Sequence, residues 1–190
     1  MHLLAISGSA REASTNTAML KAMQALAPAG IEFSVFHHLD RLPVFSPDFE
    51  QHAPLEVARF LDLVARADGL IISSPEYVRA IPGGLKNAID WMVSRFEIVG
   101  KPVALVHGSH RGDDMLASLR LVLATVSSSF LEQPFLRIPL IGRTPEDIAA
   151  LLHAPPYAAQ IGEFLRDFTA AIAQVQGHDA GRTAPPGRGG

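Results

Sequence analysis

Short apolar runs alternate along this chain with segments in which apolar residues recur at helical spacing. The runs cover residues 3–7, 31–36, 69–74, 102–107 and 134–141, and each has the length of a β-strand. The segments 57–64, 85–92, 115–126 and 161–175 repeat apolar residues at i, i+3, i+4 and i+7, as on one face of a helix. This alternation predicts an α/β protein, a parallel sheet with helices on both faces.

The pattern within each run predicts its place in the sheet. Runs 3–7, 69–74 and 102–107 are apolar throughout, as in strands buried on both faces, whereas run 31–36 alternates polar and apolar residues. The last run contains Pro139, which lacks the N–H group of a sheet ladder and is tolerated mainly on edge strands. Two edges and three inner strands give the order 2-1-3-4-5 of a flavodoxin-like three-layer sandwich.

The 190 residues fit one domain, which we expect to span residues 1–176. Residues 177–190 contain too few apolar side chains to pack and are predicted to be a disordered tail. The connection 37–54 is long for a compact domain, and long connections are usually functional or mobile, so it is a candidate to overhang a ligand.

Composition narrows the classes of function. A net charge of −3 offers no basic field to a nucleic-acid backbone, and no apolar run approaches the ~20 residues of a membrane span. The chain has no cysteine, which excludes disulfides and thiol catalysis and leaves redox chemistry to a bound cofactor. The start MHLLAI lacks the pattern of a signal peptide. We expect a cytoplasmic protein without nucleic-acid or membrane partners.

The loop SGSAREASTN, residues 7–16, follows the first strand and leads into a helix that we expect to begin near Asn16 or Thr17. Free N–H groups at a helix start favour an anion. The side chains that can donate hydrogen bonds to phosphate oxygens are those of Ser9, Arg11, Ser14, Asn16 and Thr17. The loop lacks both G-x-G-x-x-G and a Walker lysine, so a single terminal phosphate fits best. The alternative is that Ser14 or Asn16 only caps the helix.

Two further loops complete the predicted site. Ligands of open α/β sheets bind where the strand order reverses, here between strands one and three. The third strand is followed by SPEYVRAIPGG, whose backbone N–H groups could face a flat ring such as an isoalloxazine. The fourth is followed by HGSHRGDDM, in which Gly108 and Ser109 could flank the ring. His107 and His110 lack a third ligand at suitable spacing, so we expect no metal. Lys86 and Asp90 form an exposed helix pair without a catalytic role.

The motifs GSAREASTN and SPEYVRAIPGGLKNAIDW resemble the phosphate loop and the flavin loop of the NADPH-dependent FMN reductase family. That family includes quinone, chromate and azo-dye reductases, and the resemblance covers about residues 1–172. It implies noncovalent FMN. The resemblance places Ser9, Arg11, Ser14, Asn16 and Thr17 around the phosphate, Pro75, Glu76 and Tyr77 beside the isoalloxazine, and Gly108 and Ser109 near its far side.

The activity that the resemblance implies has two half-reactions at one face of the flavin. NADPH or NADH delivers hydride to N5 and leaves, and a quinone, azo, metal-oxyanion or flavin acceptor then takes the electrons, which gives ping-pong kinetics. No side chain is required as a catalytic acid or base. Subunits of this family pair so that a neighbour helps to wall the flavin, which implies a homodimer or homotetramer.

The sequence departs from the family pattern at Val78, where asparagine is usual, and this bears on FMN affinity and acceptor preference. Arg79 and Arg111 add positive charge, and we hypothesise that one of them favours the 2′-phosphate of NADPH or an anionic acceptor. Two alternatives stay open. One is a flavodoxin-like FMN electron carrier without a nicotinamide site, and the other is a regulator or scaffold that has lost flavin.

Overall fold

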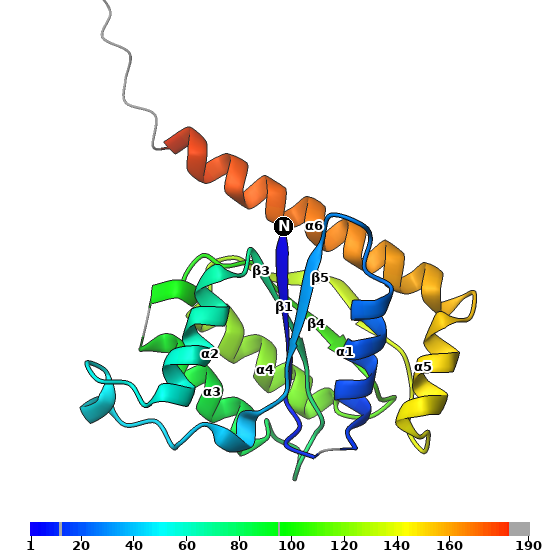
Figure 1. The fold of residues 1–190 in the computed structure, drawn as a ribbon, viewed down its shortest axis with the longest axis horizontal. Coiled ribbons are helices and arrows are strands. Elements are labelled where there is room, and N and C mark those ends of the chain that lie inside the picture. Colours follow the sequence, from blue (N-terminus) through cyan, green and yellow to red (C-terminus); the bar gives the residue numbers. More distant parts are fainter. Residues whose placement is uncertain (12, 95, 183–190) are drawn as a thin grey trace, which may run out of the picture.

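The computed structural model describes residues 1–11, 13–94 and 96–182. A five-stranded parallel sheet has the order β2-β1-β3-β4-β5, as predicted. The strands are β1 (His2–Ser7), β2 (Glu32–Phe36), β3 (Gly69–Ser73), β4 (Val103–His107) and β5 (Phe130–Arg137). In Figure 1 the chain enters β1 at the marked N-terminus, and the loops after β1 and β3 lie at the opposite, lower edge of the sheet.

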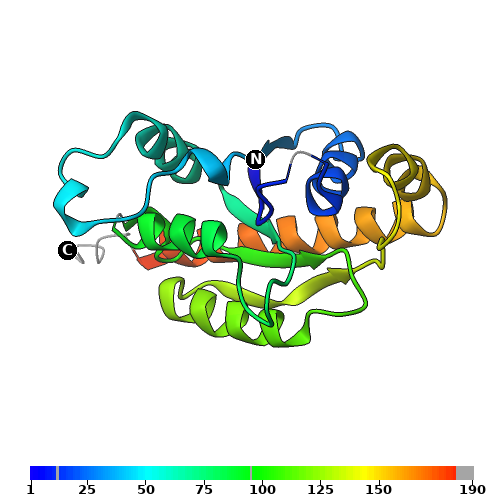
Figure 2. The ribbon, with the colours of Figure 1, turned by 90° about the horizontal axis from the view of Figure 1, so that it is seen from below.

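Helices cover both faces of the sheet because alternate strand residues point to opposite sides. Leu4 and Ile6 pack with one set of helices, whereas Leu3 and Ala5 pack with the other. The first set is α2 (Leu55–Arg66), α3 (Gly83–Val93) and α4 (Asp113–Val126), and the second is α1 (Thr15–Ala25), α5 (Pro145–His153) and α6 (Tyr157–Arg182). Figures 1 and 2 show the two sets on either side of the strands.

Three elements differ from the prediction. Strand β5 begins at Phe130 rather than at residue 134 and ends at Arg137, so Pro139 lies beyond it, although β5 is an edge strand as predicted. Helix α5 was not predicted, and it begins with a capping box between Thr144 and Asp147. Helix α6 continues past residue 177 to Arg182, and residues 183–190 of the predicted tail lie outside the described residues.

The long connection 37–54 packs against α3. The amide oxygen of Asn87 accepts a hydrogen bond from the Phe45 N–H at 2.8 Å, and the indole N–H of buried Trp91 donates to the Pro43 carbonyl at 2.8 Å. The connection includes two short 3-10 turns, η1 (Leu39–Arg41) and η2 (Pro47–Phe49). These bonds hold its middle beside α3. None of the helices in the described ranges is long and apolar enough to cross a membrane.

Candidate functional site

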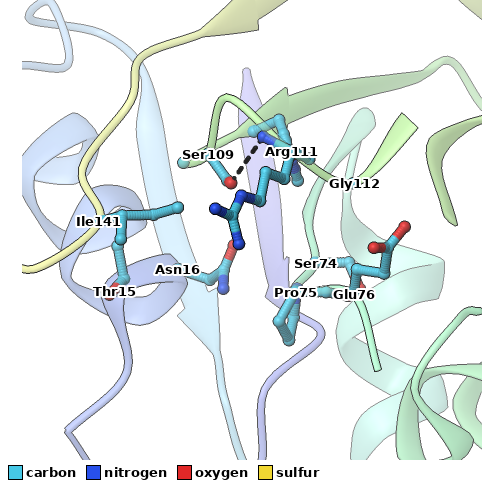
Figure 3. A pocket seen from close by; sticks show the side chains of 11 residues that line it. Thr15, Asn16, Ser74, Pro75, Glu76, Ser109, Arg111, Gly112 and Ile141 are labelled. Carbon is cyan, nitrogen blue, oxygen red and sulfur yellow. Dashed lines mark hydrogen bonds between the residues drawn. The ribbon is translucent and has the colours of Figure 1, made fainter. Parts of the chain in front are cut away.

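A pocket of about 360 Å³ opens at the carboxyl edge of the sheet. It lies between the start of α1 and the loops that follow β3, β4 and β5, beside the point where the strand order reverses. Its walls are formed by Thr15, Asn16, Ser74, Pro75, Glu76, His107, Gly108, Ser109, Arg111, Gly112 and Ile141, most of which Figure 3 labels. Loops from four different elements therefore converge on one cavity, as the sequence predicted for three of them.

The loop after β1 is held in shape by its own hydroxyl groups. Ser14 caps α1, since its hydroxyl accepts a hydrogen bond from the Thr17 N–H at 3.3 Å. The hydroxyls of Ser7 and Thr17 are 2.8 Å apart, and the Ser9 hydroxyl accepts from the Arg11 N–H at 3.2 Å. Ser9, Ser14 and Thr17 are all buried. These contacts hold the described ends of the loop beside the start of α1, whose free N–H groups can face an anion.

Two contacts join this loop to β3 and the loop that follows it. The Ser73 hydroxyl donates to the amide oxygen of Asn16 at 2.8 Å, which leaves the Asn16 NH₂ group as the free end of that amide. The Gly8 N–H donates to the Ser73 carbonyl at 2.7 Å. A Cβ on Gly8 would lie 2.6 Å from the Ser74 hydroxyl oxygen, so only glycine allows this close approach.

The loop after β3 is tied to the start of α4. The carboxylate of Glu76 accepts a hydrogen bond from the Met115 N–H at 3.2 Å, and Arg79 forms an ion pair with Asp114 at 2.5 Å. A carboxylate at a helix start is favourable because the free N–H groups there carry partial positive charge. In Figure 3 the Glu76 carboxylate points away from Asn16. Glu76 therefore contributes its backbone and Cβ side to the pocket, while its charge stabilises α4.

The tip of this loop is a tight turn in a strained conformation. Tyr77 and Ala80 exchange two backbone hydrogen bonds, of 3.0 and 3.3 Å, around Val78 and Arg79, whose φ angles are +52° and +58°. Two consecutive positive φ angles define a type I′ turn, which favours asparagine and glycine and disfavours β-branched residues. An asparagine at position 78, as in the family pattern, would adopt this turn more easily. Val78 is 98% exposed, so packing does not compensate for the strain.

The loop after β4 is organised by His107. This buried side chain contacts the Arg111 carbonyl through Nε2 at 2.6 Å. Burial lowers the pKa of His107, and the charge of Arg137 lowers it further, so the imidazole is neutral near pH 7 and its Nε2–H donates. Gly112 has a φ of +99°, and a Cβ there would lie 2.8 Å from Nε2. With the loop backbone held in this way, the Arg111 guanidinium points into the pocket toward Asn16 (Figure 3).

The residues predicted from the sequence fall into three groups. Those that line the pocket are Asn16, Pro75, Glu76, Gly108 and Ser109. Ser9, Ser14 and Thr17 are buried within the adjoining loop, and Arg11 lines a separate cavity on the other side of that loop. Tyr77 and Val78 lie on the exposed turn, outside the lining. The connection 37–54, a candidate to overhang the ligand, contributes nothing to the lining. Contact with FMN stays a prediction for every one of these residues.

Six lining residues were not among the predicted cofactor contacts: Thr15, Ser74, His107, Arg111, Gly112 and Ile141. All but Ile141 belong to the three polar loops already singled out, and their position next to a strand end was a usable signal. Ile141 was hidden because its apolar run was assigned to the fifth strand, whereas β5 ends at Arg137. The residue thus belongs to the connection that closes the pocket.

The donor groups of the pocket suit a ligand with one phosphate and a flat ring. The start of α1 lies at one end, with Thr15 and Asn16 in the lining, while Pro75, Gly108 and Ile141 give apolar and backbone walls elsewhere. The fold and this site define a flavodoxin-like α/β protein with a ligand pocket at the strand-order switch. The sequence model of the NADPH-dependent FMN reductase family matches residues 1–139. The chain belongs to this family.

Named relatives agree with this placement. The quinone reductase of Escherichia coli K12 is 34% identical over 110 residues, which are 55% of this chain and 58% of that protein. The quinone reductase of Pseudomonas putida KT2440 is 33% identical over 136 residues, covering 70% of this chain and 72% of that protein. The match thus spans little more than half of the length of the Escherichia coli relative.

A solved structure extends the similarity over nearly the whole chain. The flavoenzyme NAD(P)H:(acceptor) oxidoreductase FerB from Paracoccus denitrificans superposes with a TM-score of 0.66 at 26% identity. The superposition covers 93% of this chain and 98% of that one. The agreement supports the flavodoxin-like architecture beyond residue 139, where the family match ends.

Proposed function

We propose that this chain is an NAD(P)H-dependent, FMN-containing oxidoreductase that reduces a small-molecule acceptor of the quinone, azo, metal-oxyanion or flavin type. The observation that carries the proposal is the loop after β1, joined to β3 through Asn16 and Ser73. Such a loop presents phosphate donors beside a cavity of about 360 Å³ at the switch point. Membership of the FMN reductase family supports the same assignment.

The side chains of the loop would hold the FMN phosphate, with the N–H groups at the start of α1. Asn16 offers its NH₂ group. The Arg11 side chain lines the cavity on the other side of the loop, so we do not assign it to the FMN phosphate. Pro75 and the backbone of Glu76 on one side, and Gly108 and Ser109 on the other, would flank the ring. Bound FMN supplies a centre that accepts hydride at N5 and returns electrons to an acceptor. The chain positions both substrates in turn at one open face, which gives ping-pong kinetics and requires no acidic or basic side chain.

Of the two extra arginines, Arg111 fits the selectivity role better. Arg79 is engaged by Asp114 on the outer side of α4, whereas Arg111 lines the pocket. We therefore assign recognition of the NADPH 2′-phosphate, or of an anionic acceptor, to Arg111. The test compares kcat/KM for NADPH and NADH in wild type, Arg111→Gln and the control Arg79→Gln. Only Arg111→Gln should lower the preference for NADPH over NADH or the rate with an anionic quinone. If Arg111→Gln and Arg79→Gln both match wild type in these quantities, the assignment is wrong.

The function is tested by adding NADPH to the FMN-loaded protein without oxygen. Loss of the yellow absorbance within seconds, and its return on adding a quinone, is the expected result. A protein that binds FMN but does not bleach would be an electron carrier instead. A protein that takes up no FMN would have lost the cofactor and with it this activity.

We also propose that two or more copies assemble so that a neighbour covers the open face. Two apolar residues lie at or near the site: Val78 is 98% exposed and Ile141 is 56% exposed. Burial of such apolar side chains favours association. Light scattering on a size-exclusion column should give a dimer or tetramer. A monomer at tens of micromolar would contradict this part.

A further inference from the structure

A second cavity, of about 400 Å³, lies on the other side of the phosphate loop, between that loop, α1 and the start of the long connection. Its basic lining residues, called here the basic pocket, are Arg11, Lys21, His37, His38 and Arg41. The remaining lining residues are Ala10 and the acidic Asp40. Of the residues predicted to contact FMN, the lining has only Arg11, and it shares no residue with the pocket described above.

The positive charges of the basic pocket have no partner in the described part of the chain. Lys21, Arg41 and the Arg11 guanidinium form no ion pair with any described residue, although Asp40 lines the same cavity. Among the described lining residues, three permanent positive charges stand against one negative charge. Like charges repel when gathered in one cavity, so this arrangement is unfavourable without an anion.

His37 lies beside these charges in the lining of the basic pocket. Its Nδ1 is buried and has no hydrogen-bond partner among the described residues. Its ring lies 4.1 Å from that of His38. Burial lowers the pKa of His37, and the positive charges of His38, Lys21 and Arg41 lower it further, whereas the nearby Val35 backbone raises it. An anion in the cavity would relieve this repulsion.

We propose that the basic pocket is a second anion site, which binds a phosphate-bearing small molecule separately from the FMN phosphate. The excess charge favours a multivalent anion over a monovalent one. The cavity is larger than a phosphate group needs, so a pyrophosphate or the phosphorylated part of a nucleotide can enter. The same chemistry has two sources, a free polyanion or the 2′-phosphate end of the nicotinamide cosubstrate; in the second case Arg111 would serve the anionic acceptor.

The experiment measures binding of inorganic pyrophosphate by calorimetry to the full chain, with and without saturating FMN. The variants are Lys21→Gln and Arg41→Gln, neither of which belongs to the flavin pocket. Arg59→Gln is the matched control, because it removes one exposed positive charge on α2 outside the basic pocket. Each of the first two variants should weaken pyrophosphate binding on the order of tenfold, whereas Arg59→Gln should not. FMN affinity should be that of wild type in all three.

A spectroscopic readout separates binding in the cavity from general screening at the surface. Pyrophosphate should raise the pKa of His37, followed by NMR of its ring protons, because the anion offsets the charges of Lys21, His38 and Arg41. Protonation of His37 should therefore be coupled to pyrophosphate binding. In Arg41→Gln the pyrophosphate-induced shift should shrink.

The outcomes decide between the possibilities. Equal weakening in Arg59→Gln, or stoichiometric displacement of pyrophosphate by FMN, would overturn the proposal, since the anion would then bind nonspecifically or in the flavin cradle. If 2′,5′-ADP binds as tightly as pyrophosphate does, and 5′-AMP does not bind, the site serves the cosubstrate. If only pyrophosphate binds, it serves a free polyanion. Pyrophosphate binding requires no FMN, so failure of the proposed oxidoreductase function would leave this result readable.

Discussion

The loop after β1 and the turn after β3 meet at the same edge of the sheet but are built in opposite ways. In the first, Ser9, Ser14 and Thr17 are buried and bonded within the loop. In the second, Val78 is almost fully exposed, and two residues have positive φ angles. The first loop is held by hydrogen bonds among its own residues, which suits it to bind one kind of ligand group. The second is held by the two backbone hydrogen bonds between Tyr77 and Ala80 and by the Arg79–Asp114 ion pair, while its tip is exposed.

The largest effect is expected from adding one methyl group at the point where the loop after β1 contacts the loop after β3. In Gly8→Ala the new Cβ would lie 2.6 and 2.9 Å from the Oγ and Cβ of Ser74. The loops must separate, so we expect a loss of about 1–3 kcal/mol in the free energy of unfolding and loss of measurable FMN binding. Urea unfolding and FMN fluorescence quenching measure the two effects.

The matched control is Gly83→Ala at the start of α3, where an added Cβ meets nothing within 4 Å. We expect this variant to keep wild-type FMN affinity and stability. The double variant Gly8→Ala with Ser74→Gly should regain part of the lost stability, because the contacted atoms are removed. If Gly8→Ala binds FMN as wild type does, the close approach has no role in the site.

A change of charge in the first loop tests whether it holds a phosphate. Asn16→Asp keeps the oxygen that accepts from Ser73 but replaces the NH₂ group with a negatively charged oxygen. Like-charge repulsion in a partly buried site costs several kcal/mol, so FMN affinity should fall about 100-fold. Affinity for riboflavin, which lacks the phosphate, should change much less. An equal loss for both ligands would mean that Asn16 does not face the phosphate.

The loop after β4 resembles the first loop in being internally bonded, and this makes its stability depend on pH. The pKa of buried His107 is lowered from about 6.5 in the unfolded chain. Below pH 6.5 the unfolded state therefore binds a proton that the folded state excludes, and stability falls, by at most about 1.4 kcal/mol per pH unit. In His107→Gln this decline should be smaller between pH 7.5 and 5.5 in urea unfolding. An unchanged slope would contradict the assignment.

The smallest effect is expected at the exposed turn. In Val78→Asn the side chain tolerates the φ of +52°, so the free energy of unfolding should rise by about 0.5–1 kcal/mol. Leu121→Asn is the control, since Leu121 is also exposed, at 71%, but lies inside α4; it should give no gain. If Val78→Asn is no more stable than wild type, the turn is not strained in solution.

The strand order of the sheet could be predicted from the sequence, because the polar and apolar pattern within each strand indicates whether that strand is buried on both faces. Continuous apolar runs correctly gave the inner strands, and alternation correctly gave β2 as an edge. The reasoning for β5 was right in outcome but rested on Pro139, which lies outside the strand. Helix α5 carried a readable signal, since Pro145 follows a capping threonine, but its apolar stripe is short and the prediction assigned no element to it.

The contacts of the site could not be predicted in the same way. The bond between Ser73 and Asn16 joins residues 57 positions apart, and that between Glu76 and Met115 joins residues 39 apart. Both depend on how neighbouring loops approach once the sheet has formed. Glu76 illustrates the consequence, because its sequence position indicated a flavin contact while its carboxylate caps α4. The basic pocket likewise depends on α1 and η1 lying side by side.

The most direct test of the account is a titration of the purified chain with FMN and, in parallel, with riboflavin. If the loop after β1 binds a phosphate, one FMN molecule should bind per chain. Riboflavin should bind more weakly than FMN by a factor of about 100 or more. Equal affinity for the two flavins, or no uptake of FMN at all, would contradict the account.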